Sequence, residues 1–174
     1  MKKTIKYVTI VLAMLFSVSA YSQNCEYEIN KVDKFTNEKT ILTKPVVVGK
    51  KVKISKSLKM KTIKWSLKEE NKGKYLIINY HFIRGTIAMV GSENLNLLLS
   101  NGELVKLKLR SLVSSMNSMN FKGYEMEFEY ILTEQDLSKL IENDVTDVRV
   151  EARINGFDFS IMKGISTKLL FKCI

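Results

Sequence analysis

Residues 124–130 read Tyr-Glu-Met-Glu-Phe-Glu-Tyr, and this unbroken alternation of apolar and acidic side chains decides the fold class. Successive side chains of a β-strand point to opposite faces, so a period of two predicts a half-buried strand. The aromatic and methionine side chains would face a core, and the three glutamates would lie on the other face. A row of three like charges needs water or cationic neighbours around it.

A cationic strand is the expected neighbour of this acidic one. Lys106, Lys108 and Arg110 alternate with Leu107 and Leu109, which gives a positive row of the same period. Opposite charges on adjacent strands attract each other, so we predict that the two strands pair antiparallel. The alternative is that both rows simply face water.

The period of two recurs along most of the chain. Asn101-Gly102 and Asn155-Gly156 each lie between two such runs, and Asn-Gly in that context is the strongest short-range signal for a β-hairpin. Residues 75–82 are almost continuously apolar, which is typical of a central strand. Further alternating positions are Tyr27 and Ile29, and Ile63, Trp65 and Leu67.

One helix is predicted, at about residues 133–143. It begins with Thr-Glu-Gln-Asp at 133–136, which resembles a capping box, and it places Leu137 and Leu140 on one face. The tail, residues 165–174, fits either a strand or a short helix. We therefore predict a mainly β fold, an antiparallel sandwich or partly open barrel with one short helix.

The N-terminus has the pattern of a secretory signal peptide in residues 1–22. Lys2, Lys3 and Lys6 form a charged head, residues 5–18 are otherwise almost wholly apolar, and small residues allow cleavage near 20–22. The apolar run is too short for a spanning helix, so we expect a single β-rich domain over 23–174 without a transmembrane segment. This predicts an exported protein, periplasmic or secreted. A lipid anchor is less favoured, because Asn24 rather than a small residue precedes Cys25.

The two cysteines, Cys25 and Cys173, lie near opposite ends of the expected mature chain. In an oxidising compartment they are expected to form an intramolecular disulfide, worth about 5 kcal/mol in the chain-entropy model. Free thiols or an intermolecular bridge are the alternatives. No metal site is predicted, because two cysteines and the single histidine, His81, supply too few ligands.

Positive charge is concentrated in residues 50–74. The chain has 28 lysines and arginines against 18 acidic residues, and this segment alone holds ten lysines and only two glutamates. Such a segment predicts an anionic partner, namely a surface polymer, lipid head groups or nucleic acid. The alternative is a solvated face that keeps the protein soluble. The candidate anion-binding residues are Lys50, Lys51, Lys53, Lys56, Lys59, Lys61, Lys64 and Lys68.

Catalytic patterns are sparse, and we assign no catalytic residue and no cofactor. The single histidine lies in an apolar run, where a hydrogen-bonded structural role is more common than a catalytic one. Trp65 alternates with apolar neighbours and is expected in the core. We expect an exported, non-catalytic domain with a structural or binding role in the cell envelope or outside the cell. The alternatives are a polyanion-binding module using residues 50–74 and a small carboxylate-dependent hydrolase.

The C-terminal third carries a resemblance to known proteins. Residues 130–140, then Val148-Arg149-Val150 and the terminal Lys172-Cys173-Ile174, resemble small exported β-rich proteins of unknown function from Gram-negative bacteria. The resemblance implies an exported β domain and carries over no catalytic residue.

Overall fold

The computed structural model describes residues 25–53, 59–84, 94–115, 124–151 and 156–174. Its strands are β1 Tyr27–Val32, β2 Lys39–Thr43, β3 Val46–Lys50, β4 Lys59–Glu70, β5 Gly73–Arg84, β6 Asn94–Leu99, β7 Leu104–Ser115, β8 Tyr124–Leu132, β9 Val145–Glu151 and β10 Phe157–Ser160. The helices are α2 Glu134–Glu142 and α3 Thr167–Phe171. The strands form one open antiparallel sheet in the order β1-β2-β4-β5-β8-β7-β6-β9-β10, with β3 also on β4. The predicted mainly β, antiparallel fold is confirmed.

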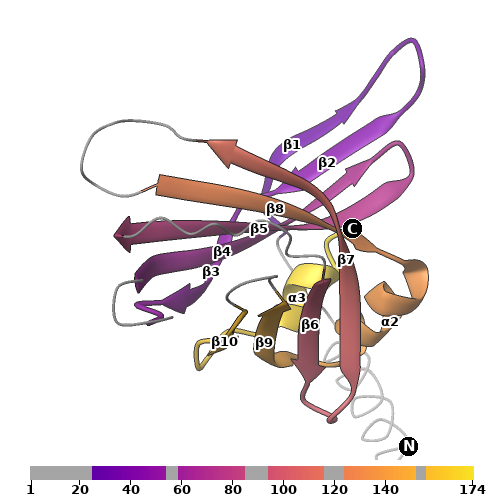
Figure 1. The fold of residues 1–174 in the computed structure, drawn as a ribbon. Helices are drawn as coiled ribbons and strands as arrows, with labels where there is room; N and C mark the ends of the chain where they lie inside the picture. Colours follow the sequence, from indigo (N-terminus) through magenta and orange to yellow (C-terminus); the bar gives the residue numbers. More distant parts are fainter. Residues whose placement is uncertain (1–24, 54–58, 85–93, 116–123, 152–155) are drawn as a thin grey trace, which may run out of the picture.

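The sheet folds over on itself at β7 and so forms two layers (Figure 1). The start of β7 pairs with β6, and its remainder pairs with β8 beyond a bulge between Leu109 and Ser111. The larger layer holds β1 to β5, β8 and the end of β7, and the smaller layer holds the start of β7 with β6, β9 and β10. On the opposite side, the Met162 amide donates a hydrogen bond to the Val48 carbonyl of β3 at 2.9 Å.

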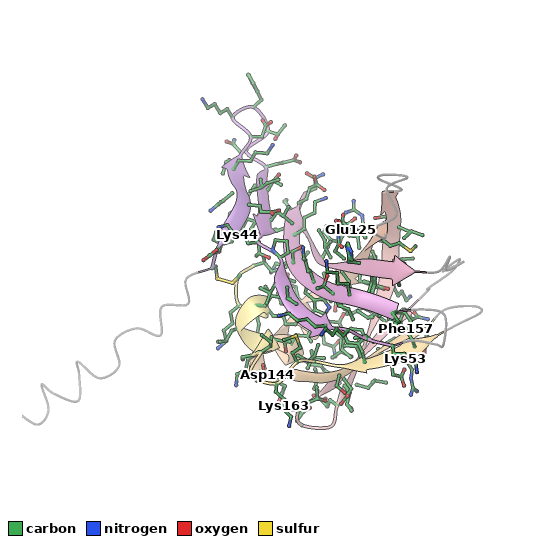
Figure 2. The ribbon with its side chains drawn as sticks, turned by 90° about the vertical axis from the view of Figure 1, so that its left-hand side faces the viewer. Lys44, Lys53, Glu125, Asp144, Phe157 and Lys163 are labelled. Carbon is green, nitrogen blue, oxygen red and sulfur yellow. A yellow bond between two sulfur atoms is a disulfide. The ribbon has the colours of Figure 1, made fainter. Side chains whose placement is uncertain are left out.

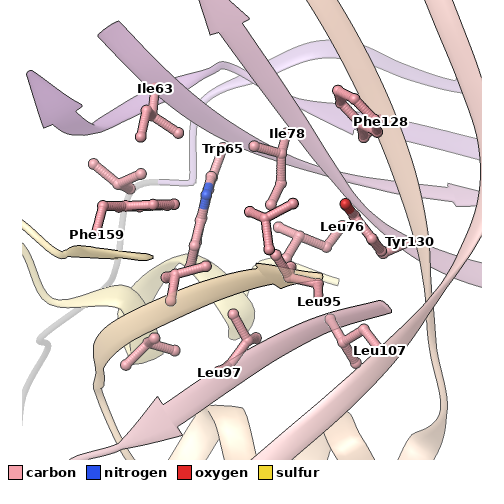
Figure 3. Close-up of a cluster of buried hydrophobic side chains, with 14 of the residues drawn as sticks. Ile63, Trp65, Leu76, Ile78, Leu95, Leu97, Leu107, Phe128, Tyr130 and Phe159 are labelled. Carbon is pink, nitrogen blue, oxygen red and sulfur yellow. The ribbon is translucent and has the colours of Figure 1, made fainter. Parts of the chain in front are cut away.

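The core lies between the two layers, where large apolar side chains meet (Figure 3). Trp65 of β4 and Tyr80 of β5 are fully buried. The Tyr80 ring lies edge-on to Phe157 of β10 at a centroid distance of 5.8 Å, and the Trp65 ring lies 6.2 Å from Phe171 of α3. Burying a large apolar side chain contributes about 1.5–3 kcal/mol, so these contacts hold the layers together. The expected core position of Trp65 is confirmed.

The alternating stretch at 124–130 forms most of β8, as predicted. Met126, Phe128 and Tyr130 are buried, and the glutamates between them lie on the outer face. The predicted neighbour is also confirmed, because β7 pairs antiparallel with β8.

The two charged rows do not face each other along their length. Glu129 lies opposite Ser111, and of the three basic residues only Arg110 contacts it, at 3.2 Å. Lys106 and Lys108 lie on the part of β7 that pairs with β6, and Lys106 contacts Glu151 instead. The bend of β7 explains the difference, because it assigns the two lysines to the other layer.

The first predicted hairpin is confirmed at Asn101-Gly102, which joins β6 to β7. Gly102 has φ of +86°, a left-handed conformation that glycine adopts without steric cost, and its amide donates to the Leu99 carbonyl at 2.9 Å. Strands β9 and β10 pair antiparallel as expected. The turn residue Asn155 between them lies outside the described residues.

Helix α2 begins and ends where the sequence predicts. The Thr133 hydroxyl accepts a hydrogen bond from the Asp136 amide, and the Asp136 carboxylate accepts one from the Thr133 amide. This is a reciprocal capping box, and Asn143 ends the helix.

The tail contains a second helix, α3, in place of a strand. The Asp144 carboxylate accepts hydrogen bonds from the Ser166 hydroxyl and from the Lys168 amide, which fixes the first turn. The fold therefore has two short helices rather than the single one predicted.

The disulfide between Cys25 and Cys173 is present, with the two Cα atoms 5.7 Å apart. It joins the residues just before β1 to those just after α3. The Tyr27 hydroxyl donates a hydrogen bond to the Cys173 carbonyl at 3.2 Å and reinforces this junction.

The predicted signal peptide, residues 1–22, lies outside the described residues. Among the helices that are described, none has the length and apolar character needed to span a bilayer.

Candidate anion-binding surface

The end of the β3–β4 hairpin carries five exposed lysines. The hairpin is anchored by Val48, Met60 and Ile63, whose side chains are fully buried in the core. Because these positions take the inward face, the polar positions between and beyond them project into solvent. We define the lysine end by its exposed residues Lys50, Lys51, Lys53, Lys59 and Lys61.

Backbone pairing brings these lysines close together. The Lys51 amide donates to the Lys61 carbonyl at 3.0 Å, and Lys53 forms an antiparallel bridge with Lys59. Two lysines therefore face each other across the hairpin end, and directly opposed like charges destabilise a sheet.

Nothing in the described part of the chain neutralises the lysine end. None of its five side chains has a carboxylate within ion-pair distance there, whereas Lys44 and Lys74, for example, contact Glu26 and Glu134 at 3.0 and 3.1 Å. An anion bound at this end would relieve repulsion without displacing an internal partner.

Lys163 is a further exposed lysine that lies near β3. It is exposed and directly follows Met162, whose amide is hydrogen-bonded to β3. Figure 2 shows Lys163 and Lys53 on the body of the molecule, away from the projecting hairpin. The sequence offered no signal for this position, because a long-range backbone contact brings it near β3.

The other predicted lysines do not belong to this cluster. Lys64 and Lys68 are half-buried on the outer face of the larger layer, and Lys56 lies outside the described residues. Lys68 contacts Glu70 at 2.7 Å and Glu129 at 3.5 Å. The hydrogen bond between Lys68 and Glu70 raises the pKa of the lysine and lowers the pKa of the glutamate.

The glutamate row of β8 has partners on both sides. We define the glutamate face as Glu125, Glu127 and Glu129 on the outer side of the larger layer. Glu129 is only 13% exposed, and it contacts Arg110 and accepts a hydrogen bond from the Ser111 hydroxyl at 2.9 Å. The Arg110 guanidinium also lies 4.2 Å from the centre of the Tyr75 ring, a cation–π contact.

Glu125 and Glu127 complete this face. Glu125 contacts the His81 imidazole at 3.0 Å, so the histidine lies on the outer side of its strand and has a polar partner. Burial raises the pKa of Glu127, and the neighbouring Glu129 charge raises it further. These contacts occupy the carboxylates and favour a structural role for the row.

Comparison of the chain with protein-family models, with curated proteins and with solved structures gives no match.

Proposed function

We propose that the protein is an exported, non-catalytic domain that binds a polyanion through the lysine end, in the cell envelope or outside the cell. One observation carries the proposal: five exposed lysines gather at one hairpin end with no counter-charge among the described residues, and Lys53 lies directly opposite Lys59. The N-terminal signal pattern and the Cys25–Cys173 disulfide support the exported location.

The chemistry of lysine defines the class of partner. A lysine ammonium is a compact, hydrated point charge, whereas arginine offers a planar fork that fits a single phosphate or carboxylate. Every member of the lysine end is a lysine, so the surface suits repeated charges more than one precisely shaped group. A linear anionic polymer or a layer of anionic head groups meets this description, and binding should weaken steeply as salt is added.

The test compares two variants of equal net charge. In the first, Lys50, Lys51, Lys53 and Lys59 are replaced with glutamine. In the control, four exposed lysines elsewhere, none ion-paired to a described residue, are replaced in the same way: Lys39, Lys72, Lys108 and Lys172. Retention on immobilised heparin and on vesicles containing an anionic lipid is measured over a range of salt concentrations.

The first variant should bind at least about 100-fold more weakly at low salt, since each lysine near an anionic surface contributes about 1 kcal/mol. The control should bind nearly as the parent protein does. Equal losses in both variants would show that net charge alone drives retention, and the proposal would then be wrong.

A further inference from the structure

The outer face of the smaller layer carries a cavity of about 320 Å³ with one polar and one apolar side. This layer is formed by the start of β7 with β6, β9 and β10 (Figure 1). Binding cavities in proteins span about 300–1,000 Å³, so this one suits a single small ligand. The outward-facing residues that line it come from all four strands: Asn96, Leu98, Leu104, Asp147, Arg149 and Asp158.

Asn96 has a buried oxygen that lacks a hydrogen-bond donor. The residue is only 7% exposed, and its side-chain nitrogen donates to the Glu151 carboxylate at 2.7 Å, which lowers the pKa of Glu151. Because a carboxylate only accepts, this bond fixes the orientation of the amide. The oxygen on its other side has no donor among the described residues. A buried acceptor without a donor destabilises a fold, and a ligand that supplies an O–H or N–H group would satisfy it.

A second planar group is held beside Asn96. Arg149 is its register partner on β9, and the Nε and Nη2 atoms of Arg149 donate to the two Asp158 oxygens at 2.9 and 2.8 Å. This bidentate pair orients the guanidinium, whose Nη1 has no acceptor in the described part of the chain. One Asp147 oxygen accepts from the Ser160 hydroxyl, and the other is unused there. The polar side therefore offers two unused acceptors and one unused donor.

Two leucines form the apolar side. Leu98 on β6 and Leu104 on β7 are register partners, and they are 38% and 60% exposed. Side chains at directly opposed positions of neighbouring strands lie side by side, so the two leucines form one apolar surface. Asp147 lies opposite Leu98 on β9, which places the polar and apolar sides next to each other.

The charges on this face balance, in contrast to those at the lysine end. Lys106 contacts Glu151 at 3.4 Å, and Arg149 contacts Asp158 at 2.8 Å. An ion meets no excess of opposite charge here, so the face favours an uncharged ligand. Its basic residues are Lys106, Lys108 and Arg149, and its acidic residues are Asp147, Glu151 and Asp158.

We propose that this cavity binds one uncharged saccharide residue. A sugar hydroxyl both donates and accepts, so hydroxyls of one ring can donate to the Asn96 and Asp147 oxygens and accept from Nη1 of Arg149. The C–H face of the ring is apolar and would lie on the two leucines. A hydrocarbon would leave the Asn96 oxygen without a donor, and an ammonium ion would lie beside the guanidinium.

The first test is an amide NMR titration of the protein with the methyl glycosides of glucose, galactose, mannose and N-acetylglucosamine. At least one glycoside should shift the side-chain signals of Asn96 and Arg149 saturably, with a dissociation constant of about 1–10 mM, a range that ligands of this size reach. Added salt should not change this constant, because the ligand is uncharged.

Charged molecules of similar size serve as the counter-probes in the same titration. Butylammonium and butyrate should bind at least about 10-fold more weakly than the best glycoside. Tighter binding of either ion at Asn96 would overturn the proposal, as would the lack of a saturable shift with all of the glycosides.

The second test uses two asparagines that both donate to Glu151. Asn96→Leu removes the unsatisfied oxygen from the cavity and should weaken glycoside binding about 10-fold, as expected for one hydrogen bond. Asn94→Leu removes the other contact to Glu151, at 3.0 Å, but lies outside the cavity lining and should keep the parent affinity. Equal losses in the two variants would show that the Glu151 contacts, rather than the free oxygen, matter, and the proposal would be wrong.

A change on the exposed apolar side avoids any disturbance of the buried amide. Leu104→Ser alters a largely exposed side chain and should weaken glycoside binding several-fold without affecting folding. Parent affinity in both Leu104→Ser and Asn96→Leu would also overturn the proposal. The glutamine variant of Lys50, Lys51, Lys53 and Lys59 should bind the glycoside as the parent does, so each of the two proposals can fail without the other.

Discussion

The glutamate face and the lysine end lie on the same layer of the molecule, yet only the glutamate face has partners of opposite charge among the described residues. Glu129 is nearly buried and has Lys68, Arg110 and Ser111 within 3.5 Å. At the lysine end, Lys53 faces Lys59 across a backbone bridge with no carboxylate nearby in the described chain. Charge on the first surface stabilises the fold, whereas charge on the second remains available to a ligand.

The position of each surface in the sheet explains this difference. Strand β8 is an interior strand between β5 and β7, so both neighbours supply polar and cationic side chains to its outer face. The β3–β4 hairpin end lies at a margin, because β4 is the one strand that pairs with β3 among the described residues. A like-charged row can persist at a margin because water screens it.

The largest effect should come from removing the charge of Glu129. Glu129→Gln leaves Lys68 and Arg110 with one carboxylate fewer in a half-buried network, and it should lower the free energy of unfolding by about 2 kcal/mol. Lys64→Gln, on the same face but without an ion pair, should change it by less than about 0.5 kcal/mol. Urea unfolding followed by circular dichroism measures both. Equal losses would show that the glutamate face has no special stabilising network.

A smaller effect of opposite sign is expected at the lysine end. Lys53→Glu replaces a repulsive pair with an attractive one opposite Lys59, and it should raise the free energy of unfolding by about 0.5 kcal/mol. Lys39→Glu makes the same change in charge opposite the uncharged Val32 and serves as the control. No gain over that control would indicate that the repulsion across the bridge is already screened.

Added salt should change the effect of the lysine-end substitution on the free energy of unfolding by a few tenths of a kcal/mol, and it should leave the effect of the glutamate-face substitution nearly unchanged. Raising ionic strength from about 0.01 M to about 1 M shortens the screening length roughly tenfold. The stability advantage of Lys53→Glu over the parent should shrink over this range, because it depends on exposed charges. The deficit of Glu129→Gln should persist, since its pairs are half-buried. Unfolding curves at the two salt concentrations provide the measurement.

The smallest effect concerns pH and Glu127. The pKa of Glu127 in the folded protein is raised, first by burial and then by the charge of Glu129. Between the usual carboxyl pKa and this raised pKa, the folded protein keeps a proton on Glu127 that the unfolded chain has released. The contribution of Glu127 to the free energy of unfolding therefore falls as pH rises between these two pKa values, and it stays constant at higher pH. Glu127→Gln should gain stability relative to the parent as pH rises from about 4 to about 7. A constant difference across that range would contradict the assignment.

Local patterns in the sequence were enough to predict several elements. The alternation at 124–130 predicted β8, the Thr133–Asp136 capping box predicted the start of α2, and the paired cysteines predicted the disulfide. Each of these depends on side-chain periodicity or on residues close in sequence, with the disulfide following from the oxidising compartment that the signal pattern predicts.

The features that sequence could not supply depend on long-range geometry. The bulge between Leu109 and Ser111 sends Lys106 and Lys108 to the smaller layer, and no residue pattern marks that bend. Lys163 comes near β3 through the Met162–Val48 hydrogen bond, which no local pattern predicts. The cavity beside the disulfide needs β3 and α3 to come together, which depends on the whole fold.

The Cys25–Cys173 bond, which spans 148 positions of sequence, also determines how the domain responds to force. A pull applied through the residues before Cys25 and through Ile174 passes directly across the two sulfur atoms. The hydrogen bonds of the sheet then carry none of that load, so the domain acts as an inextensible link. Only reduction of the bond would let tension reach the strands and unravel them.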